Sequence, residues 1–403
     1  MDFDLSGRSE AWLEKLQAFF DQEVLPRHRA WLEHAARGEA APFMGDLQRK
    51  ARAAGLWNLG LPELAEDEPG TRLSNLEYAP LAEVMGRLFW APEVFNCQAP
   101  DVPNMIALQN CATPEQKERW LRPLLEARTR SAFGMTEPDV ASSDATNIAT
   151  TITRDGNDYI IRGRKWFITG AAEAAHFIIL ARTSSDARRG LSAFLFHKDQ
   201  PGWRILRRIP IMGPEEHGGH CELEFDGLAV APEDVLMAEG DGMKAAQIRL
   251  GPARLTHCMR WLGLAKRCVE IATEYAAERR GFGVRLADRE SVQLMLGALA
   301  MNIEIGRLLV VKAAWELDRG ERARKEISMA KIHMARTLHE AADVGIQING
   351  ARGYSKDTVL EWIYRYARQA RLVDGADEVH RMLLCQELAA EGSDFWRWPV
   401  AVV

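Results

Sequence analysis

The chain has 403 residues, which is enough to bury a large core and to form two or three domains. Hydrophobic residues make up 47% and charged residues 27%, the ordinary balance of a soluble globular protein. The 51 basic and 57 acidic side chains leave a net charge of −6, so the composition gives no reason to expect binding to nucleic acid or to an anionic membrane surface.

The N-terminal segment Met1–Arg8 is acidic and has neither the pattern of a signal peptide nor the Arg-rich composition of a transit peptide. No run approaches the roughly 20 apolar residues that a membrane span needs. The six cysteines are scattered without a Cys-x-x-Cys pair, which is typical of reduced thiols. We therefore expect a cytoplasmic protein without stable membrane insertion.

Residues 1–130 predict an N-terminal α-helical domain. Apolar residues between Trp12 and Phe20 recur at helical spacing, and Pro26 is expected to kink or end this first helix. The segment Thr113–Gln116 is typical of a helix start, with a Thr N-cap, Pro at the first position and Gln at the third. Further helices are predicted over residues 44–55, 73–88 and 115–126.

Residues 131–238 predict a middle domain built on an antiparallel β-sheet. Short runs of β-branched and aromatic residues alternate with turn signals such as Arg154–Asp158, a pattern of strands joined by hairpin-like gaps. The predicted strands cover residues 147–153, 159–162, 176–182, 191–197, 203–208 and 221–225.

Residues 239–392 predict a C-terminal helical bundle, followed by a tail over 393–403 that either packs on a neighbour or frays. One apolar stripe recurs at i, i+4, i+7 and i+11; it consists of Val292, Leu296, Leu299 and Ile303. The long helices are predicted over residues 251–280, 291–319 and 325–347. The fold class is therefore α+β and mostly α, with helices, then the sheet, then a four-helix bundle.

The chain lacks the common nucleotide-binding loops and the nucleophile elbow of serine hydrolases. In the segment His217–Cys221, the side chains of His217, His220 and Cys221 are competent metal ligands. No second cluster completes a ligand set, so the alternative is a flexible loop whose imidazoles face solvent or a ligand. We expect no metal.

Asp374 is the candidate general base. It lies in the segment Arg371–His380, after two apolar residues and before Gly375. An apolar neighbourhood disfavours the ionised carboxylate, and the glycine permits a tight bend and the close approach of another molecule. The alternative interpretation is an ordinary Asp-Gly turn.

Two further segments, Phe133–Asp144 and Lys165–Gly170, combine aromatic groups with hydroxyls. The aromatic and thioether groups suit a flat apolar ring, and the hydroxyls and backbone N–H groups suit polar ring edges. Taken singly, each segment is also explained as sheet core and turn. Their occurrence together in one chain is the more specific observation.

Four motifs in this order resemble the acyl-CoA dehydrogenase family over nearly the whole chain. Phe133–Asp144 resembles the family's aromatic-x-x-Thr-Glu-Pro segment, and Lys165–Thr169 resembles its Lys-x-aromatic-Ile-Thr segment. Glu278–Gly283 is similar to its Glu-Arg-x-x-Phe-Gly, and Gln347–Tyr354 to its Gln-Ile and Gly-aromatic turn.

The resemblance implies FAD as cofactor, bound between the sheet domain and the bundle, with parts supplied by a second subunit of a homodimer or homotetramer. Arg279 is implied to reach the pyrophosphate of the neighbouring subunit's FAD, because its fork suits phosphate oxygens. The implied cofactor-binding residues are Phe133, Met135, Thr136, Ser142, Ser143, Phe167, Ile168, Thr169, Arg279, Phe282, Gln347, Ile348, Gly350, Ala376 and Glu378.

The resemblance places Ser143, Arg254 and Gly375 on the path of an acyl-CoA substrate and Asp374 at the position of the catalytic base. Most of the family has glutamate there, and this chain resembles a branch that has aspartate in the sequence Asp-Gly-x-Asp-Glu-Val-His. Aspartate is one methylene shorter, so its carboxylate reaches less far. Gly251 and Glu290 also depart from the family, which has an acid and a glutamine in many members.

The implied reaction belongs to fatty acid metabolism and β-oxidation. Asp374 removes the α proton of the thioester while the β hydride passes to flavin N5, which gives trans-2-enoyl-CoA and reduced FAD. The electrons are expected to pass to an electron-transferring flavoprotein. The alternatives are an acyl-CoA oxidase, a flavin monooxygenase, against which Asp374 argues, and a colourless binding protein of the same fold. The sequence leaves the acyl chain open.

Overall fold

The structure, a computed structural model, describes residues 4–186, 189–213 and 218–397. The chain divides into two compact units, Met1–Ala253 and Arg254–Val403. The boundary falls inside helix α8 (Gly242–Glu278), which begins in the first unit and ends in the second.

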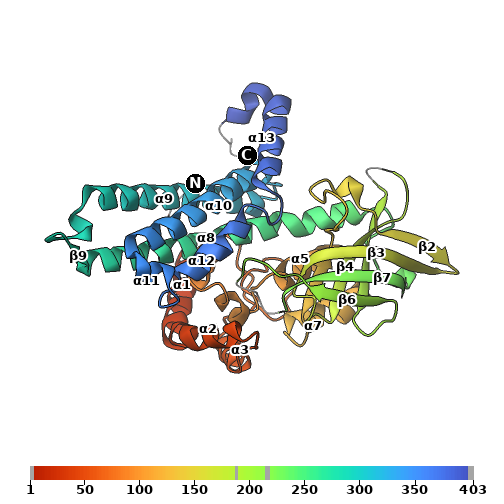
Figure 1. Ribbon diagram of the computed structural model, residues 1–403. Helices are drawn as coiled ribbons and strands as arrows, with labels where there is room; N and C mark the ends of the chain where they lie inside the picture. Colours follow the sequence, from red (N-terminus) through yellow and green to blue (C-terminus); the bar gives the residue numbers. More distant parts are fainter. Residues whose placement is uncertain (1–3, 187–188, 214–217, 398–403) are drawn as a thin grey trace. The chain divides into compact units, whose positions relative to one another are not determined.

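The first unit begins with short helices (Figure 1). Three of them form one irregular stretch around Pro26, where a π turn and a 3₁₀ turn follow α1, so the predicted interruption at this proline is confirmed. The helices are α1 (Gly7–Phe19), η1 (Phe20–Val24), η2 (Leu25–Arg27), α2 (His28–Ala36), α3 (Met44–Ala53), α4 (Asn75–Gly86), η3 (Ala91–Phe95), α5 (Asp101–Cys111), α6 (Pro114–Gln116), η4 (Lys117–Leu121) and α7 (Arg122–Leu125).

The capping box predicted at Thr113 is present. The Thr113 hydroxyl accepts a hydrogen bond from Gln116 N, and the Gln116 side chain accepts one from Thr113 N at 3.1 Å. The same glutamine donates from Nε2 to the carbonyl oxygens of Glu233 and Val235, at 2.7 and 2.9 Å. This helix start therefore also ties the helical part of the first unit to the end of its sheet.

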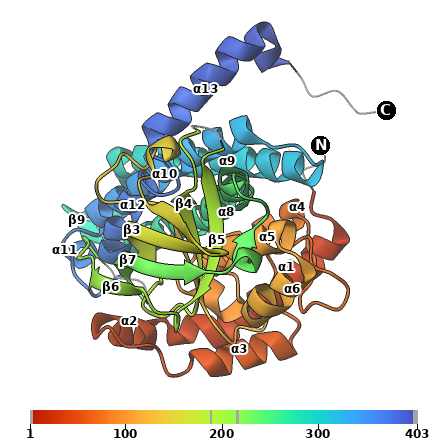
Figure 2. The ribbon, with the colours of Figure 1, turned by 90° about the vertical axis from the view of Figure 1, so that its right-hand side faces the viewer.

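The sheet of the first unit has eight strands. Figure 2 shows β3, β4, β5, β6 and β7 of this sheet. The strand order is β6-β7-β3-β2-β4-β5-β8, with β1 also paired to β4. The strands are β1 (Ser131–Gly134), β2 (Thr151–Asp155), β3 (Asp158–Thr169), β4 (His176–Arg182), β5 (Leu191–His197), β6 (Trp203–Arg208), β7 (His220–Val230) and β8 (Val235–Leu236), with 3₁₀ turns η5 (Ala145–Asn147) and η6 (Pro232–Asp234).

The sheet is mixed, which corrects the prediction of a wholly antiparallel sheet. Strand β4 pairs antiparallel with β5 on one edge, but β1 and the first residue of β2 pair with its other edge in parallel. Parallel pairing needs a crossover between the two strands, and the chain between β1 and β4 contains the β2–β3 hairpin. Phe177, Phe194 and Phe196 are fully buried in the core of this sheet.

The second unit is a bundle of α8, α9, α10 and α12. Gly306 of α9 lies against Met334 of α10 and Leu262 of α8, and Gly345 of α10 lies against Leu360 of α12 and Cys268 of α8. Glycines at these crossings let the helices approach closely. Besides α8, the elements are β9 (Arg280–Gly281), β10 (Val284–Arg285), η7 (Leu286–Asp288), α9 (Glu290–Asp318), α10 (Arg324–Asn349), α11 (Ala351–Tyr354), α12 (Leu360–Ala370), α13 (Asp377–Glu391) and η8 (Gly392–Trp396).

Helix α9 has one buried stripe and one exposed apolar face. The predicted stripe is confirmed, because Leu299 and Ile303 are buried and Val292 and Leu296 pack against the core around Ala272. Its opposite face exposes Leu294, Met295, Met301, Ile305 and Leu308. Among the described residues, α9 is the one helix whose length and composition would suit a membrane span, so the expectation that no run comes near that composition was wrong. The core helix of a soluble protein can have the same composition, but only 22% of the most apolar stretch of α9 is buried.

Candidate active site

The turn that carries Asp374 lies between α12 and α13 in the second unit. Asp374 has a φ of +54° and Gly375 a φ of +104°, both in the left-handed region. A residue other than glycine in that region costs roughly 1–3 kcal/mol and persists where its surroundings hold it. Three side chains hold this turn, and each acts on a backbone carbonyl.

Arg254 of α8 donates from Nε to the carbonyl oxygen of Asp374 at 2.8 Å, and His380 Nε2 lies 3.3 Å from the same oxygen. Lys331 of α10 donates from Nζ to the carbonyl oxygen of Gly375 at 2.6 Å. Burial lowers the pKa of His380 to about 4, so this imidazole is neutral near pH 7. Burial also lowers the pKa of Lys331 and of Arg254.

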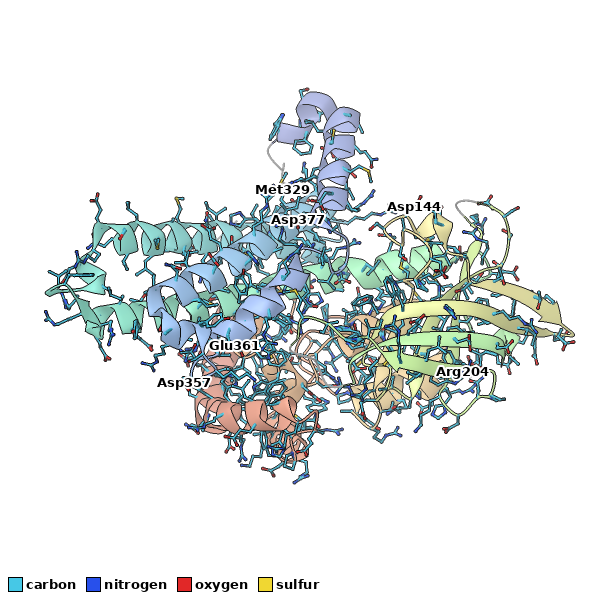
Figure 3. The ribbon with its side chains drawn as sticks, viewed as in Figure 1. Asp144, Arg204, Met329, Asp357, Glu361 and Asp377 are labelled. Carbon is cyan, nitrogen blue, oxygen red and sulfur yellow. The ribbon has the colours of Figure 1, made fainter. Side chains whose placement is uncertain are left out.

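Asp377 anchors the turn to α13, at whose start it stands (Figure 3). Its carboxylate is buried and lies 2.8 Å from Arg371 Nε, 3.7 Å from Lys331 Nζ and 3.9 Å from Arg336 Nε. The hydrogen bond to Asp377 raises the pKa of Arg371. A buried carboxylate is retained where cations surround it, so Asp377 and its partners fix the backbone on the C-terminal side of Asp374.

The carboxylate of Asp374 contacts a histidine that the sequence analysis did not single out. Oδ2 of Asp374 lies 3.3 Å from Nε2 of His257 on α8, and both side chains are 16% exposed. The His257 ring stacks on Trp261 at a centroid distance of 5.5 Å. The two partners are 117 residues apart in the chain, and no local pattern around His257 marks it, so only the fold reveals the contact.

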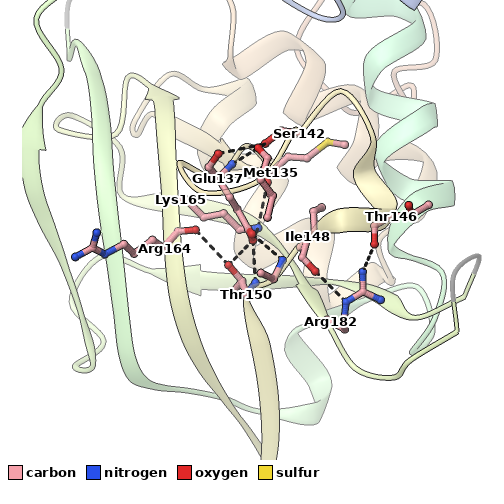
Figure 4. Close-up of polar contacts among 11 residues, drawn as sticks. Met135, Glu137, Ser142, Thr146, Ile148, Thr150, Arg164, Lys165 and Arg182 are labelled. Atoms are coloured by element: carbon pink, nitrogen blue, oxygen red, sulfur yellow. Dashed lines mark hydrogen bonds and ion pairs between the residues drawn. The ribbon is translucent and has the colours of Figure 1, made fainter.

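In the first unit, the segment after β1 is fastened to β3 by a buried ion pair (Figure 4). Lys165 Nζ lies 2.7 Å from Glu137 Oε1 and donates to the carbonyl oxygen of Met135 at 3.1 Å. Burial lowers the pKa of Lys165 to about 8. Burial alone raises the pKa of Glu137, but the Lys165 charge and hydrogen bonds from Thr150 and Ala149 bring it below its usual value.

This fastening positions the two predicted residues Thr136 and Ser142. Thr136 accepts a backbone hydrogen bond from Trp166 N at 2.9 Å, and the Ser142 hydroxyl accepts one from Glu137 N at 2.9 Å. Ser142 therefore holds the loop in shape. Met135 and Thr136 are half-buried, and Ser143 is exposed.

A bulge in β3 exposes Phe167. The pairing of β3 with β7 shifts between Lys165 and Ile168, and Phe167 has a φ of +52° and a side chain that is 42% exposed. Beyond it, the Thr169 hydroxyl lies 3.0 Å from His220 Nδ1. Ile168 is buried in the sheet core, so its side chain is unavailable to a ligand and only its backbone can serve.

Phe133 presents one ring face to a cation of its own chain. The guanidinium of Arg249 lies 4.0 Å from the centroid of the Phe133 ring, and Arg249 Nε donates to Asn104 Oδ1 at 2.6 Å. A cation over a ring face is attracted by the ring's quadrupole. Phe133 is thus held in place, and a ligand can reach only the surface that Arg249 leaves uncovered.

A third group of predicted residues lies at the hairpin end of the bundle. Phe282 and Gly283 form the turn between β9 and β10, with φ values of +51° and +84°, and Phe282 is fully exposed. Arg279, Gln347 and Gly350 are exposed. Ile348 is instead buried among Ala272 and Ala276, so its predicted contact with a cofactor is limited to its backbone.

The hairpin group and the Asp374 turn are far apart within the second unit. Arg254 lies on α8 and Arg279 directly after its last residue. The two are 25 residues apart, which is about 38 Å along a helix. Of the other predicted residues, Ala376 is the N-cap of α13, next to the Asp374 turn, and Glu378 is exposed in the first turn of α13. The structure thus sorts the predicted residues of this unit into two separate groups.

The segment His217–Cys221, whose side chains were weighed as metal ligands, lies only partly within the described residues. His217 lies outside the described residues. The ring of His220 lies 5.9 Å from that of Phe167, whereas Cys221 is fully buried in the sheet core. Within residues 4–186, 189–213 and 218–397, no group of three or more His, Cys, Asp or Glu side chains is arranged to hold a metal ion.

Family models of three acyl-CoA dehydrogenase domains match nearly the whole chain. The N-terminal domain matches residues 7–128, the middle domain residues 132–228 and the C-terminal domain residues 240–389. The order of the three matches is the order of helices, sheet and helices in the structure.

Similar proteins carry the same family name. The chain is 41% identical to FadE2 of Mycobacterium tuberculosis, described as a probable acyl-CoA dehydrogenase, over 98% of this chain and 99% of that one. It is 40% identical to acyl-CoA dehydrogenase family member 11 of Gallus gallus over 94% of this chain, and it spans about half (50%) of that relative's length. A solved structure from Mycobacterium abscessus, of a presumed acyl-CoA dehydrogenase, matches with a TM-score of 0.92 and 39% identity, over 96% of this chain and 100% of that one. The chain belongs to the acyl-CoA dehydrogenase family.

Proposed function

We propose that this protein removes two hydrogens from the α and β carbons of an acyl-CoA thioester, with Asp374 as the base that takes the α proton. The observation that carries the proposal is the Asp374 turn. Its backbone is held in the left-handed region by Arg254, His380 and Lys331, and its carboxylate remains 16% exposed. A carboxylate that is carried on a fixed backbone and is still accessible suits general base catalysis.

The backbone N–H of Asp374 supports the same assignment. Among the described residues this N–H has no acceptor. Removal of an α proton places negative charge on the thioester oxygen, and a fixed N–H donor stabilises that charge. In this proposal, Asp374 therefore contributes both the base and one donor, and the rigidity of its turn keeps the two in register.

The residues of the first unit fit a flat ring with polar edges, so FAD is the cofactor of this proposal. Phe167 exposes an aromatic ring in a strained bulge, and Thr136 and Thr169 bring hydroxyl groups on fastened segments. Met135 and the uncovered surface of Phe133 add apolar contact. When bound, FAD supplies an acceptor for the hydride of the β carbon. Lys165 and Glu137 contribute by holding the loop that carries these groups.

A second copy of the chain completes the cofactor site in this proposal. Phe282 is fully exposed and Tyr354 is 82% exposed at the hairpin end of the bundle. Arg279, exposed beside them, suits a phosphate group because its guanidinium donates in a fork. Since Arg279 lies about 38 Å along α8 from Arg254, residues at the two ends of the bundle serve different cofactor molecules. The exposed apolar face of α9 is a further surface that a homo-oligomer buries.

The electron acceptor in this proposal is an electron-transferring flavoprotein. An oxidase of the same fold passes its electrons to oxygen instead, and the two are separated by measuring hydrogen peroxide against substrate turnover. Peroxide formed at the rate of turnover identifies the oxidase. The substrate is an acyl-CoA, and a panel of thioesters that differ in chain length, branching and hydroxylation determines which one.

The test is anaerobic bleaching of the bound flavin by acyl-CoA thioesters from short to very long chains, including branched and 4-hydroxylated ones. At least one of them is expected to bleach the flavin and to leave a trans-2-enoyl-CoA product. If no member of the panel bleaches the flavin of a folded, FAD-loaded protein, the proposed reaction is wrong.

A further inference from the structure

The contact between His257 and Asp374 adds a second residue to the proposed base. His257 Nε2 lies 3.3 Å from Asp374 Oδ2, and His257 is the one side-chain partner of this carboxylate among the described residues. An ionised carboxylate only accepts hydrogen bonds, so a hydrogen bond between these two atoms requires the hydrogen on Nε2. The imidazole is itself held, because it stacks on Trp261 one turn further along α8.

The groups that hold the turn act on the backbone and leave the side chain of Asp374 free to rotate. Arg254 and His380 contact the carbonyl oxygen of Asp374, and Lys331 contacts that of Gly375. None of these contacts selects the direction of the carboxylate. His257 is the group placed to do so, because a donor 3.3 Å from Oδ2 favours one plane of the carboxylate and leaves Oδ1 to face a substrate.

We propose that His257 is a positioning residue that aims the carboxylate of Asp374 at the α carbon of the substrate and, through its own protonation, sets the pH range in which that base works. The inference rests on the proposed function. Positioning matters more for aspartate than for glutamate, because the shorter side chain has fewer rotatable bonds by which its carboxylate can approach the α carbon.

The proton step is as follows. The α C–H bond breaks, the proton joins Oδ1 of Asp374, and the electron pair stays on the substrate as an enolate. Neutral His257 stays beside Oδ2 throughout. Protonated His257 is a charged donor that stabilises the ionised carboxylate and makes it a poorer base, so protonation of His257 slows the step.

Other titratable groups also face this pair. On α8, burial raises the pKa of Cys258 to about 12, and the cation of Arg254 faces the turn. On α13, burial lowers the pKa of His380 to about 4. On α10, burial lowers the pKa of Lys331, which contacts Gly375 and lies 3.7 Å from Asp377. Because Lys331 is unchanged in every variant below, comparison between variants isolates His257.

The test measures proton removal apart from oxidation. A 3-thia-acyl-CoA has sulfur in place of the β carbon, so it can lose α protons but has no β hydride to give. Its α hydrogens are followed by proton NMR as they exchange for deuterium in heavy water, with FAD-loaded enzyme, over a range of pH. The chain length is the one whose natural thioester bleaches the flavin fastest.

In His257→Leu the exchange is expected to slow by roughly 100-fold at neutral pH, as for a misplaced catalytic group. In His257→Gln the side-chain amide replaces the donor, so most of the rate is expected to return, while the inflection caused by the imidazole disappears from the pH profile. His333→Gln is the matched control, because His333 Nε2 lies 2.7 Å from the carbonyl oxygen of Asn302, away from the turn.

A wild-type rate in His257→Leu overturns the inference, and so does a wild-type pH profile in His257→Gln, which remains measurable if the leucine variant does not fold. These failures differ from failure of the proposed function. If wild-type enzyme neither exchanges the analogue nor is bleached by any acyl-CoA, then Asp374 is not the base of such a reaction. If it does both and the His257 variants match it, only the role of His257 is wrong.

Discussion

Lys331 Nζ lies 2.6 Å from the carbonyl oxygen of Gly375, the residue that follows the proposed base. Its Nζ is also 3.7 Å from Asp377 Oδ1, and both of these side chains are 1% exposed. One buried cation therefore joins the carbonyl of the turn to the start of α13. This arrangement explains how a strained turn is kept in one conformation, and it leads to the first prediction.

Replacing Lys331 by Met is expected to destabilise the fold by about 3 kcal/mol, because it leaves the buried carboxylate of Asp377 with fewer cations and the Gly375 carbonyl without its donor. Urea unfolding measures the loss. Lys356→Met, at an exposed position, is the control and is expected to stay within about 0.5 kcal/mol of wild type. Equal stability of the two variants would show that Lys331 does not hold the turn.

His380 predicts a loss of stability in mild acid. Its pKa in the folded protein is about 4 because of burial, against 6.5 without burial. Between these values the unfolded chain binds the proton and the folded chain does not. The stabilisation is therefore complete above pH 6.5 and is lost as the pH falls toward 4, with a total of about 3 kcal/mol.

His380→Gln removes this titrating group while keeping a side chain that can bond to Ser328, which now lies 3.0 Å from His380 Nδ1. The wild type is expected to be the more stable protein at pH 7, and its advantage is expected to shrink between pH 6.5 and 4. Thermal unfolding at several pH values checks this. An advantage that stays constant over the interval contradicts the assignment of the acid sensitivity to His380.

The ion pair of Glu137 and Lys165 fastens the loop that carries Met135 and Thr136, so the two charges are expected to depend on each other for the stability of the fold. Glu137→Gln leaves the charge of Lys165 buried without its partner, which is expected to cost about 3–5 kcal/mol. Adding Lys165→Met to that variant removes the unpaired charge and is expected to restore part of the loss. If the double variant is as unstable as the sum of the single variants, the two residues do not act as a pair.

The exposed positions of Arg279 and Phe282 lead to a prediction about FAD binding. A change at Arg279 is expected to weaken FAD binding while the single chain still folds. Both side chains are exposed, so Arg279→Gln is expected to weaken FAD binding by roughly 10–100-fold through lost charged hydrogen bonds while folding is kept. FAD fluorescence on dilution measures the affinity, and light scattering reports the oligomer. Arg285→Gln, whose guanidinium pairs with Asp288 at 2.9 Å, is the matched control. Unchanged affinity in Arg279→Gln would remove this end of the bundle from the cofactor site.

The fold follows from the sequence wherever local pattern decides. Strands β4, β5 and β6 have the predicted bounds, because β4 and β5 are short apolar runs, β6 carries Trp203, Ile205 and Leu206 among its arginines, and turn signals flank all three. Helix α5 was not predicted, because Asp101–Cys111 carries a proline and lacks a one-sided apolar stripe, and most of it is buried all round. The parallel pairing of β1 with β4 was also missed, since it joins Ser131 to His176 across a hairpin and no local signal encodes it.

The candidate site shows the same division. Asp374 and Gly375 stand out in the sequence, and the left-handed turn there agrees with the Asp-Gly pattern. Ile168 and Ile348 are buried. Side chains alternate between the two faces of a strand and one side of a helix faces the core, and a match to a motif does not take either into account. Three partners of the turn, His257, Arg254 and Lys331, come from two long helices, so their meeting depends on how α8 and α10 pack.

The most direct test of the central claim is the rate at which an acyl-CoA bleaches the flavin of Asp374→Asn under anaerobic conditions, compared with wild type. Asparagine keeps the size of the side chain but cannot take a proton, so the rate is expected to fall by roughly 10²–10⁴-fold while thioester binding is retained. Asp343→Asn, at an exposed position of α10, is expected to bleach at the wild-type rate. Bleaching of Asp374→Asn at the wild-type rate would contradict the account, because another group would then be removing the proton.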